Sequence, residues 1–327
     1  ITRTPLRISL VGGGTDLPLY YENYGGRVLS LSIQKHIYIA VNKRFENEEF
    51  LLKYAEIEKV YNIQEIKHNL IRSILSTYKL EPIELVSISE LSGGTGLGSS
   101  SAFAVGLHAA CLELQNSRYD QSTLAEKACV TEMVDLGEPI GKQDQYGTSI
   151  GGIKEIEFLR GGAVNVNTLV LSSNVVSVLE NSLILIRVKG TRSAKLILED
   201  QTKKSKSDAK LHNFMHRMKD QVGEAKQLIG SNPDCIGEFL NEGWALKREL
   251  SEKISNKVVD ELYDYGLERG ALGGKLLGAG QSGFMLFYVP EKNRSTFIAS
   301  FSNELVHHVK IDFEGCRCLT QESSQII

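Results

Sequence analysis

The stretch Glu90-Leu-Ser-Gly-Gly-Thr-Gly-Leu-Gly-Ser-Ser-Ser-Ala102 is the most informative part of this sequence. Its glycines are interspersed with Ser and Thr hydroxyls, and an apolar-periodic stretch follows from Ala102 to Leu114. A glycine-rich loop that opens a helix is suited to phosphate, because glycine lets the backbone approach phosphoryl oxygens. The free N–H groups and the dipole of the helix then favour the negative charge. We therefore expect this loop to bind a nucleotide triphosphate or a similar polyphosphate.

Other interpretations of this loop fit the sequence less well. A Walker A loop needs a lysine after its last glycine, where this chain has Ser99. A dinucleotide-binding turn needs the spacing Gly-x-Gly-x-x-Gly, which Gly94, Gly96 and Gly98 do not keep. A flexible Gly/Ser linker is the remaining alternative. Leu97 and the abrupt start of an apolar helix argue against a linker.

Length and composition set the broad class. The 327 residues are comfortable for two domains, and 42% hydrophobic with 24% charged residues is typical of a globular protein. A net charge of -3 gives no sign of a nucleic-acid surface. We found no apolar run of membrane-spanning length and no signal peptide, and the five scattered cysteines favour a reducing compartment. The sequence therefore predicts a cytoplasmic protein with no nucleic-acid or membrane partner, and it leaves a homodimer possible.

Periodicity predicts a mixed order of strands and helices. Strands are expected at 7–11, 28–41 (one bent strand or a pair), 83–88, 164–170, 183–188, 283–289 and 306–313. Helices are expected at 63–78, 101–115, 122–136, 194–230, 235–268 and 291–304, with Ser122 and Ser193 as helix caps. Cys316-Arg-Cys318 is interpreted as strand packing rather than as a zinc site. This order favours an α+β fold over a doubly wound parallel sheet, with domains at 1–175 and 176–327.

Two further glycine clusters change the interpretation of the first. Gly12-Gly-Gly-Thr-Asp16 follows the first strand and Gly278-Ala-Gly-Gln-Ser-Gly283 precedes a later one, and each alone is typical of a turn. Together the three read P-x-R-x-S-x-x-G-G-G-T-D, G-x-G-L-G-S-S-S-A and K-L-L-G-A-G-x-S-G, in this order along the chain. With these motifs the chain resembles the GHMP kinases over almost its whole length. The resemblance implies an N-terminal domain like ribosomal protein S5 domain 2 and a ferredoxin-like C-terminal domain. It also implies ATP, Mg²⁺ and phosphoryl transfer to a small molecule between the domains.

The resemblance also implies roles for single residues. Ser100 and Glu132 are expected to hold Mg²⁺, Asp144 to act as the catalytic base, and Arg7 to lie near the transferred phosphate. Without the resemblance, Glu132 would be interpreted as an exposed helix residue and Arg7 as a surface arginine. Whether Asp144 removes a proton or orients the hydroxyl stays open. The nucleotide is expected at Gly93, Gly94, Thr95, Gly96, Leu97, Gly98, Ser99, Ser100 and Ser101.

The acceptor is suggested by the first motif and by Pro139-Ile-Gly-Lys-Gln-Asp-Gln-Tyr146. Both resemble the sugar-phosphate branch of the family, which implies phosphorylation of the anomeric hydroxyl of D-glycero-D-manno-heptose 7-phosphate. Cationic and helix-start groups are expected to hold its phosphate. The acceptor residues are expected to be Gly13, Gly14, Thr15, Asp16, Lys142, Thr191, Arg192, Ser193 and Gly280. The alternatives are a fucose- or galactose-type kinase and a non-catalytic binding protein of the same fold.

Overall fold

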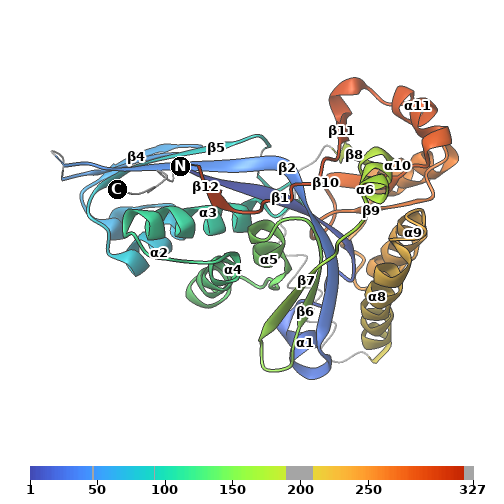
Figure 1. Ribbon diagram of the computed structural model, residues 1–327, viewed down its shortest axis with the longest axis horizontal. Helices are drawn as coiled ribbons and strands as arrows, with labels where there is room; N and C mark the ends of the chain where they lie inside the picture. Colours follow the sequence, from blue (N-terminus) through green and yellow to red (C-terminus); the bar gives the residue numbers. More distant parts are fainter. Residues whose placement is uncertain (46–47, 92, 189–208, 320–327) are drawn as a thin grey trace.

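The computed structural model describes residues 1–319 apart from 46–47, 92 and 189–208. It has an α+β fold, with one large and one smaller sheet and helices against both (Figure 1). No helix in the described ranges combines the length and apolar character that crossing a membrane requires. The predicted boundary at residue 175 falls between the last long strand of the large sheet and the first strand of the small one.

The large sheet is organised around one long strand, β2. Its order is β12-β1-β2-β5-β3-β4, with β6 on the first half of β2 and β7 on β6. All pairs are antiparallel except β3 with β5. The strands are β1 (Thr2–Val11), β2 (Gly26–Lys43), β3 (Phe50–Lys53), β4 (Ile57–Val60), β5 (Ile83–Ser89), β6 (Ile153–Phe158), β7 (Val164–Thr168) and β12 (Arg317–Cys318). The stretch expected at 28–41 is thus a single strand, which changes partner along its length.

Helices cover one face of this sheet. They are α2 (Asn69–Tyr78), α3 (Ser99–Leu114), α4 (Gln121–Cys129) and α5 (Gln143–Ser149). The expected helix at 63–78 starts later, because Ile63–Glu65 forms a 3₁₀ turn and α2 begins at Asn69. The cap predicted at Ser122 is wrong: Asp120 is the cap of α4, and its side chain accepts a hydrogen bond from the N–H of Thr123. Beyond α4 the chain widens into a π-helical turn, Val130–Asp135.

The small sheet is buried on both faces. It consists of β8 (Leu183–Val188), β9 (Gly273–Leu276), β10 (Gly283–Tyr288) and β11 (Val306–His308), in the antiparallel order β11-β8-β10-β9. In β8 the apolar residues alternate: Leu183 and Leu185 join the core shared with the large sheet, and Ile184 and Ile186 join a second core. Two buried faces explain why residues 183–186 form a continuous apolar run instead of an alternating one.

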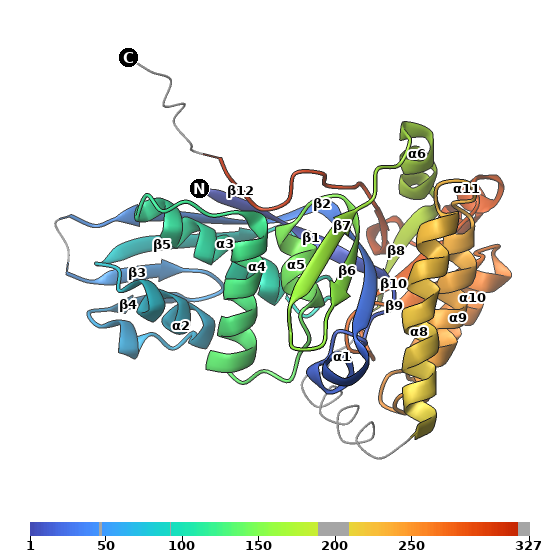
Figure 2. The same ribbon diagram turned by 60° about the horizontal axis from the view of Figure 1, so that its bottom comes forward.

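Within the described ranges, six helices accompany the small sheet or join the two halves. They are α1 (Pro18–Tyr24), α6 (Ser173–Ser182), α8 (Ala209–Leu228), α9 (Cys235–Glu249), α10 (Lys257–Glu268) and α11 (Glu291–Ala299). Helices α8 and α9 lie side by side (Figure 2). The sequence had not indicated α1 or α6. His212 and His216 pack with Tyr24, and the hydroxyl of Tyr20 lies 2.7 Å from Nδ1 of His216, so this pair of histidines joins α8 to α1.

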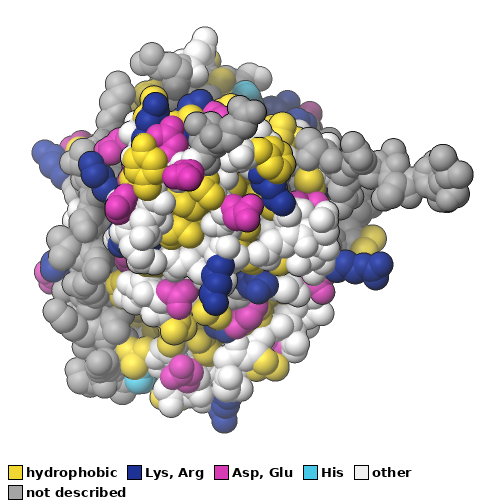
Figure 3. Space-filling model, turned by 90° about the vertical axis from the view of Figure 1, so that its left-hand side faces the viewer, with side chains coloured by type: hydrophobic (Ala, Val, Ile, Leu, Met, Phe, Trp, Pro, Cys, Tyr) yellow, Lys and Arg dark blue, Asp and Glu magenta, His cyan; other side chains and the backbone are white. Residues whose placement is uncertain are grey.

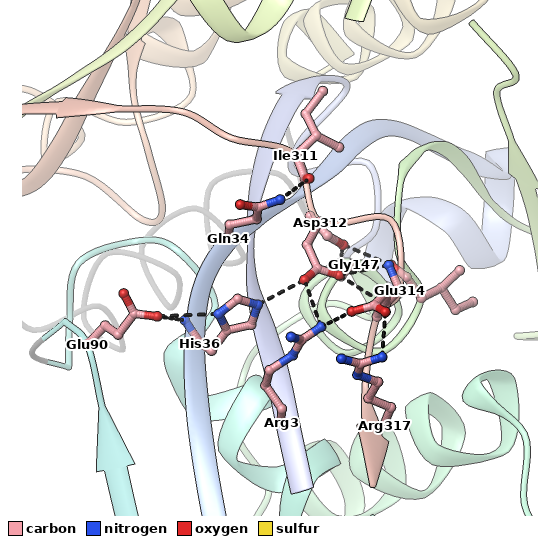
Figure 4. Close-up of polar contacts among 12 residues, drawn as sticks. Arg3, Gln34, His36, Glu90, Gly147, Ile311, Asp312, Glu314 and Arg317 are labelled. Atoms are coloured by element: carbon pink, nitrogen blue, oxygen red, sulfur yellow. Dashed lines mark hydrogen bonds and ion pairs between the residues drawn. The ribbon is translucent and has the colours of Figure 1, made fainter. Parts of the chain in front are cut away.

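The C-terminal segment returns to the large sheet. The strand predicted at 306–313 is wrong beyond residue 308, because the chain leaves the small sheet there and Ile311 bridges to Ile33. His36 on β2 lies between two carboxylates, with Nε2 2.8 Å from Oδ2 of Asp312 and Nδ1 3.3 Å from Oε1 of Glu90 (Figure 4). Arg3 pairs with Asp312 as well. This polar network connects the C-terminal segment with the residues just before the glycine-rich loop.

Surface side chains are mixed in type at the end of the molecule that carries β4. Apolar, acidic and basic side chains lie interspersed there (Figure 3). Ile57, Tyr61 and Ile88 are among the exposed apolar residues of the large-sheet half. Scattered exposed apolar residues are normal for folded proteins.

Candidate functional site

A cavity of about 320 Å³ lies between the two sheets. Its walls come from β1, the turn after β1, the glycine-rich loop, the start of α3, the π-helical turn, the start of α5, α9 and β9. Residues from all three glycine motifs line it, although they are far apart in sequence. The cavity therefore brings together the segments that the sequence singled out.

The glycine-rich loop forms one wall through alternate residues. Gly94, Gly96 and Gly98 have φ values of 73°, 79° and 77°, in the left-handed region that favours glycine. A Cβ on Gly96 would lie 2.3 Å from the carbonyl oxygen of Leu277. Because Leu277 belongs to the third motif, that motif packs directly against Gly96 of this loop. The intervening Thr95 and Leu97 are buried and anchor the loop, and Gly93 is exposed outside the cavity lining.

The start of α3 completes this wall. Ser99, Ser100 and Ser101 line the cavity as the first residues of a helix of 16 residues. The first N–H groups of a helix have no intrahelical acceptor and carry the positive end of its dipole. Loop and helix start together have a geometry suited to a phosphate group, and phosphate binding at these residues stays a prediction.

Glu132 lies at the junction of α3, the π-helical turn and α5. The hydroxyl of Ser100 donates to its Oε1 at 2.7 Å, and Ser101 and Gln145 both donate to Oε2 at 2.7 Å. Glu132 is only 3% exposed, and burial raises the pKa of its carboxyl. The interpretation of Glu132 as an exposed helix residue is therefore excluded. In the part of the chain that the structure describes, neutral groups alone donate to this carboxylate.

Arg7 and Asp144 form a partly buried ion pair in the cavity wall. Nε and Nη2 of Arg7 both donate to Oδ1 of Asp144, at 2.9 and 2.7 Å, and Nη1 donates to the carbonyl of Gly96 at 2.7 Å. The side chain of Arg7 is 4% exposed, whereas that of Asp144 is 30% exposed. Oδ2 of Asp144 accepts no hydrogen bond from the described residues, so one carboxylate oxygen remains for a ligand hydroxyl.

Asp16 lines the cavity near Asp144. Its Oδ1 accepts hydrogen bonds from the N–H of Gly14 and from Nε2 of Gln143, both at 2.9 Å. Asp16 is 2% exposed, and burial, together with the charge of Asp144, raises its pKa to about 6. Two neighbouring carboxylates, one of them with a raised pKa, suit a site that binds hydroxyl groups and accepts a proton.

The structure places several predicted acceptor residues outside the cavity lining. Lys142 Nζ donates to Glu126 and to the carbonyl of Gly162, so its charge is already paired. The hydroxyl of Thr15 is buried and bonds the carbonyls of Gly12 and Arg27. These two side chains stabilise the protein locally instead of facing a ligand.

Of the remaining predicted acceptor residues, some line the cavity, one does not, and three lie outside the described residues. Gly280 packs against the backbone of Ile254 and does not line the cavity, whereas Gly13 and Gly14 do. Thr191, Arg192 and Ser193 lie outside the described residues.

Sequence reasoning missed four residues that the structure brings to the site. Gln145 supports Glu132, and Gln143 supports Asp16. Lys275 on β9 and Lys247 on α9 line the cavity as cations from the small-sheet half. Lys275 opens the third motif, so a signal was present there, whereas nothing in the local sequence distinguishes Lys247 from other helix lysines.

Comparison with known proteins agrees with this geometry. The model of the GHMP kinases N-terminal domain matches residues 63–152, and that of the GHMP kinases C-terminal domain matches 225–304. The D-glycero-alpha-D-manno-heptose 7-phosphate kinase of Campylobacter jejuni is 31% identical over 93% of each chain. The bifunctional fucokinase/GDP-fucose pyrophosphorylase of Arabidopsis thaliana is 24% identical over 94% of this chain and 31% of its own length.

Solved structures show the same fold. A D-glycero-D-manno-heptose 1-phosphate kinase from Bacteroides thetaiotaomicron superposes with a TM-score of 0.78, at 23% identity over 96% of this chain and 97% of its own. The galactokinase of Lactococcus lactis superposes with a TM-score of 0.73, at 17% identity over 97% and 94% of the two chains. With a relative above 30% identity across nearly its full length, the chain belongs to the GHMP kinases, phosphotransferases that use ATP.

Proposed function

We propose that this enzyme phosphorylates the anomeric hydroxyl of D-glycero-D-manno-heptose 7-phosphate, giving the 1,7-bisphosphate for nucleotide-activated heptose synthesis. The observation that carries the reaction type is Asp144, which Arg7 anchors through one oxygen while the other is left toward the cavity. The choice of acceptor rests on the Campylobacter jejuni relative, which matches over 93% of its length. The fucokinase relative supports a second candidate, an unphosphorylated sugar such as fucose.

The residues divide the work of phosphoryl transfer, which mainly requires positioning and charge stabilisation. Backbone N–H groups of the glycine-rich loop and of the start of α3 hold the phosphates. Asp16 accepts hydrogen bonds from the acceptor, and Asp144 takes the proton of the attacking hydroxyl. That hydroxyl oxygen bonds to the terminal phosphorus as the bond from phosphorus to the ADP oxygen breaks. Arg7 keeps Asp144 in place and counters charge near the transferred group.

The residues at Glu132 fit a magnesium ion. A buried carboxylate beside a serine hydroxyl supplies the oxygen ligands that Mg²⁺ prefers, and a cation there offsets the cost of burying the charge of Glu132. Ser100 and Glu132 would hold the ion. When bound, it would neutralise the triphosphate and fix its orientation.

An assay of ADP release with Mg-ATP tests the proposed function. The acceptors are heptose 7-phosphate, mannose 6-phosphate, fucose and galactose. We expect strong turnover with the heptose phosphate, and turnover with fucose alone would instead establish the second candidate. Asp144→Asn should lower kcat roughly 10²- to 10⁴-fold with little change in the KM for ATP. Asp264→Asn, on the exposed face of α10, is the control. If Asp144→Asn keeps full kcat, the assignment of the base is wrong.

A further inference from the structure

Lys275 is a buried cation that the proposed reaction has not yet used. It lies on β9, is 6% exposed and lines the cavity. Its Nζ donates to the carbonyl of Leu10 on β1 at 3.2 Å, which is its one hydrogen bond to the described residues. An ammonium group has three N–H donors, so this contact leaves donor capacity at the cavity wall. The described part of the chain offers Lys275 no carboxylate partner.

Other buried lysines of the chain are more completely paired. Lys154 Nζ donates to the hydroxyl of Ser32 at 2.7 Å, and it also reaches the carbonyls of Ile150 and Gly152. Lys142 pairs with Glu126 and lies off the cavity. A buried charge without a counterion is costly, so its presence at a cavity wall points to an anionic ligand.

The charges around Lys275 strengthen this conclusion. Burial lowers the pKa of the Lys275 ammonium, and the nearby positive charge of Arg7 on β1 lowers it further, to about 8. Arg7 is itself neutralised by Asp144. Lys247, the cation from α9, already donates to the carbonyls of Leu276 and Gly278. Among the described residues, no acid forms an ion pair with Lys275 on β9.

The position of Lys275 relative to the glycine-rich loop indicates which anion this is. Leu277 lies two residues further along the chain, and its carbonyl oxygen touches the Cβ position of Gly96. Nη1 of Arg7 bonds the carbonyl of that same Gly96. Lys275 thus belongs to the strand that leads into the contact with the glycine-rich loop, where the proposed function puts the phosphates.

We propose that Lys275 is a further catalytic residue whose ammonium binds a phosphoryl oxygen in the cavity that Arg7 and Asp144 also line. The inference rests on the phosphoryl transfer proposed above. The oxygen comes either from the group being transferred from ATP or from the phosphate that the acceptor already carries. Lys275 exchanges no proton in either case, because the hydroxyl proton goes to Asp144 and ADP leaves with the bridging oxygen.

Two measurements on Lys275→Met and Lys275→Arg test this role. The first is the dissociation constant of ATP against that of ADP, without any acceptor. The second is kcat and KM for heptose 7-phosphate and for the same heptose without its phosphate. Lys154→Met is the matched control, since it removes a buried lysine of lowered pKa that does not line the cavity. Thermal unfolding of each variant separates misfolding from loss of contact.

The two sources of the phosphoryl oxygen give different results. If Lys275 binds the transferred group, Lys275→Met raises the dissociation constant of ATP at least tenfold more than that of ADP. It also lowers kcat for both acceptors. If it binds the phosphate of the acceptor, KM rises at least tenfold for the phosphorylated heptose alone. Lys275→Arg should retain most activity and extend it to higher pH, since the wild-type ammonium is lost above about pH 8.

The inference is overturned if Lys275→Met changes neither the ratio of ATP to ADP affinity nor either kcat/KM by more than threefold. It is also overturned if Lys154→Met produces the same changes. If the wild-type enzyme phosphorylates none of the sugars, the proposed acceptor is refuted. The dissociation constants of ATP and ADP then still test whether Lys275 binds the transferred group. If Lys275→Met does not fold, Lys275→Gln replaces it in both measurements under the same criteria.

Discussion

Asp16→Asn should make the protein more stable and less active at the same time. Burial raises the pKa of Asp16 from 3.8 to about 6, so the folded state holds its proton more tightly than the unfolded state does. The unfolded chain therefore releases this proton at lower pH, and the contribution of Asp16 to stability falls as the pH rises from about 4 to 6. At one pKa unit per 1.36 kcal/mol, the ionised carboxylate costs the folded state about 3 kcal/mol at pH 7.5.

The amide of Asn removes this cost and keeps one acceptor oxygen for Gly14 and Gln143. The variant loses the longer hydrogen bond, in which the backbone N–H of Gln143 donates to Oδ2 of Asp16 at 3.3 Å. This bond contributes about 1 kcal/mol. We therefore expect Asp16→Asn to raise the free energy of unfolding by about 2 kcal/mol at pH 7.5. At pH 5 the burial cost in the wild type is about half as large, so the difference should shrink by about 1.5 kcal/mol.

Urea unfolding at pH 7.5 and pH 5, followed by far-UV circular dichroism, measures this difference. In the same variant, kcat/KM for the acceptor should fall roughly 10- to 100-fold, because a charged hydrogen bond to the substrate is lost. The wild-type kcat/KM should also decline below about pH 6, where Asp16 becomes protonated, and the variant should lack that decline. An Asp16→Asn protein that is less stable than the wild type at pH 7.5 would refute the reasoning.

Two further predictions concern the phosphate wall. Glu132→Gln should raise the Mg²⁺ concentration for half-maximal activity at least tenfold, measured by magnesium titration of ADP release, because it removes the buried charge beside Ser100; an unchanged titration would place the ion elsewhere. Gly96→Ala should raise the KM for ATP and lower the unfolding midpoint, since its Cβ would lie 2.3 Å from the carbonyl oxygen of Leu277. Gly94→Ala is the matched control, with a φ of 73° but open space at its Cβ, so it should show only the left-handed strain of about 1 kcal/mol. Equal effects of the two substitutions would contradict the importance of the contact with Leu277.

The sequence by itself determined the features that depend on local backbone chemistry. Glycines at 94, 96 and 98 are needed because those positions have positive φ, so the loop is recognisable without any structure. The order of the three motifs was sufficient to predict the family and the α+β fold, which the comparisons confirm. Burial on both faces made residues 183–186 of β8 a continuous apolar run, which the sequence pattern alone indicates as a strand.

Only the tertiary structure decided which charged side chains face the cavity. Lys142 lies two residues before Asp144 in sequence, yet it turns to Glu126, whereas Lys275 comes from another sheet and reaches the cavity wall. Asp120 replaces Ser122 as the cap of α4 because its carboxylate reaches the N–H of Thr123. Charge pairing and burial depend on packing between segments distant in the chain, and no local pattern encodes that distance.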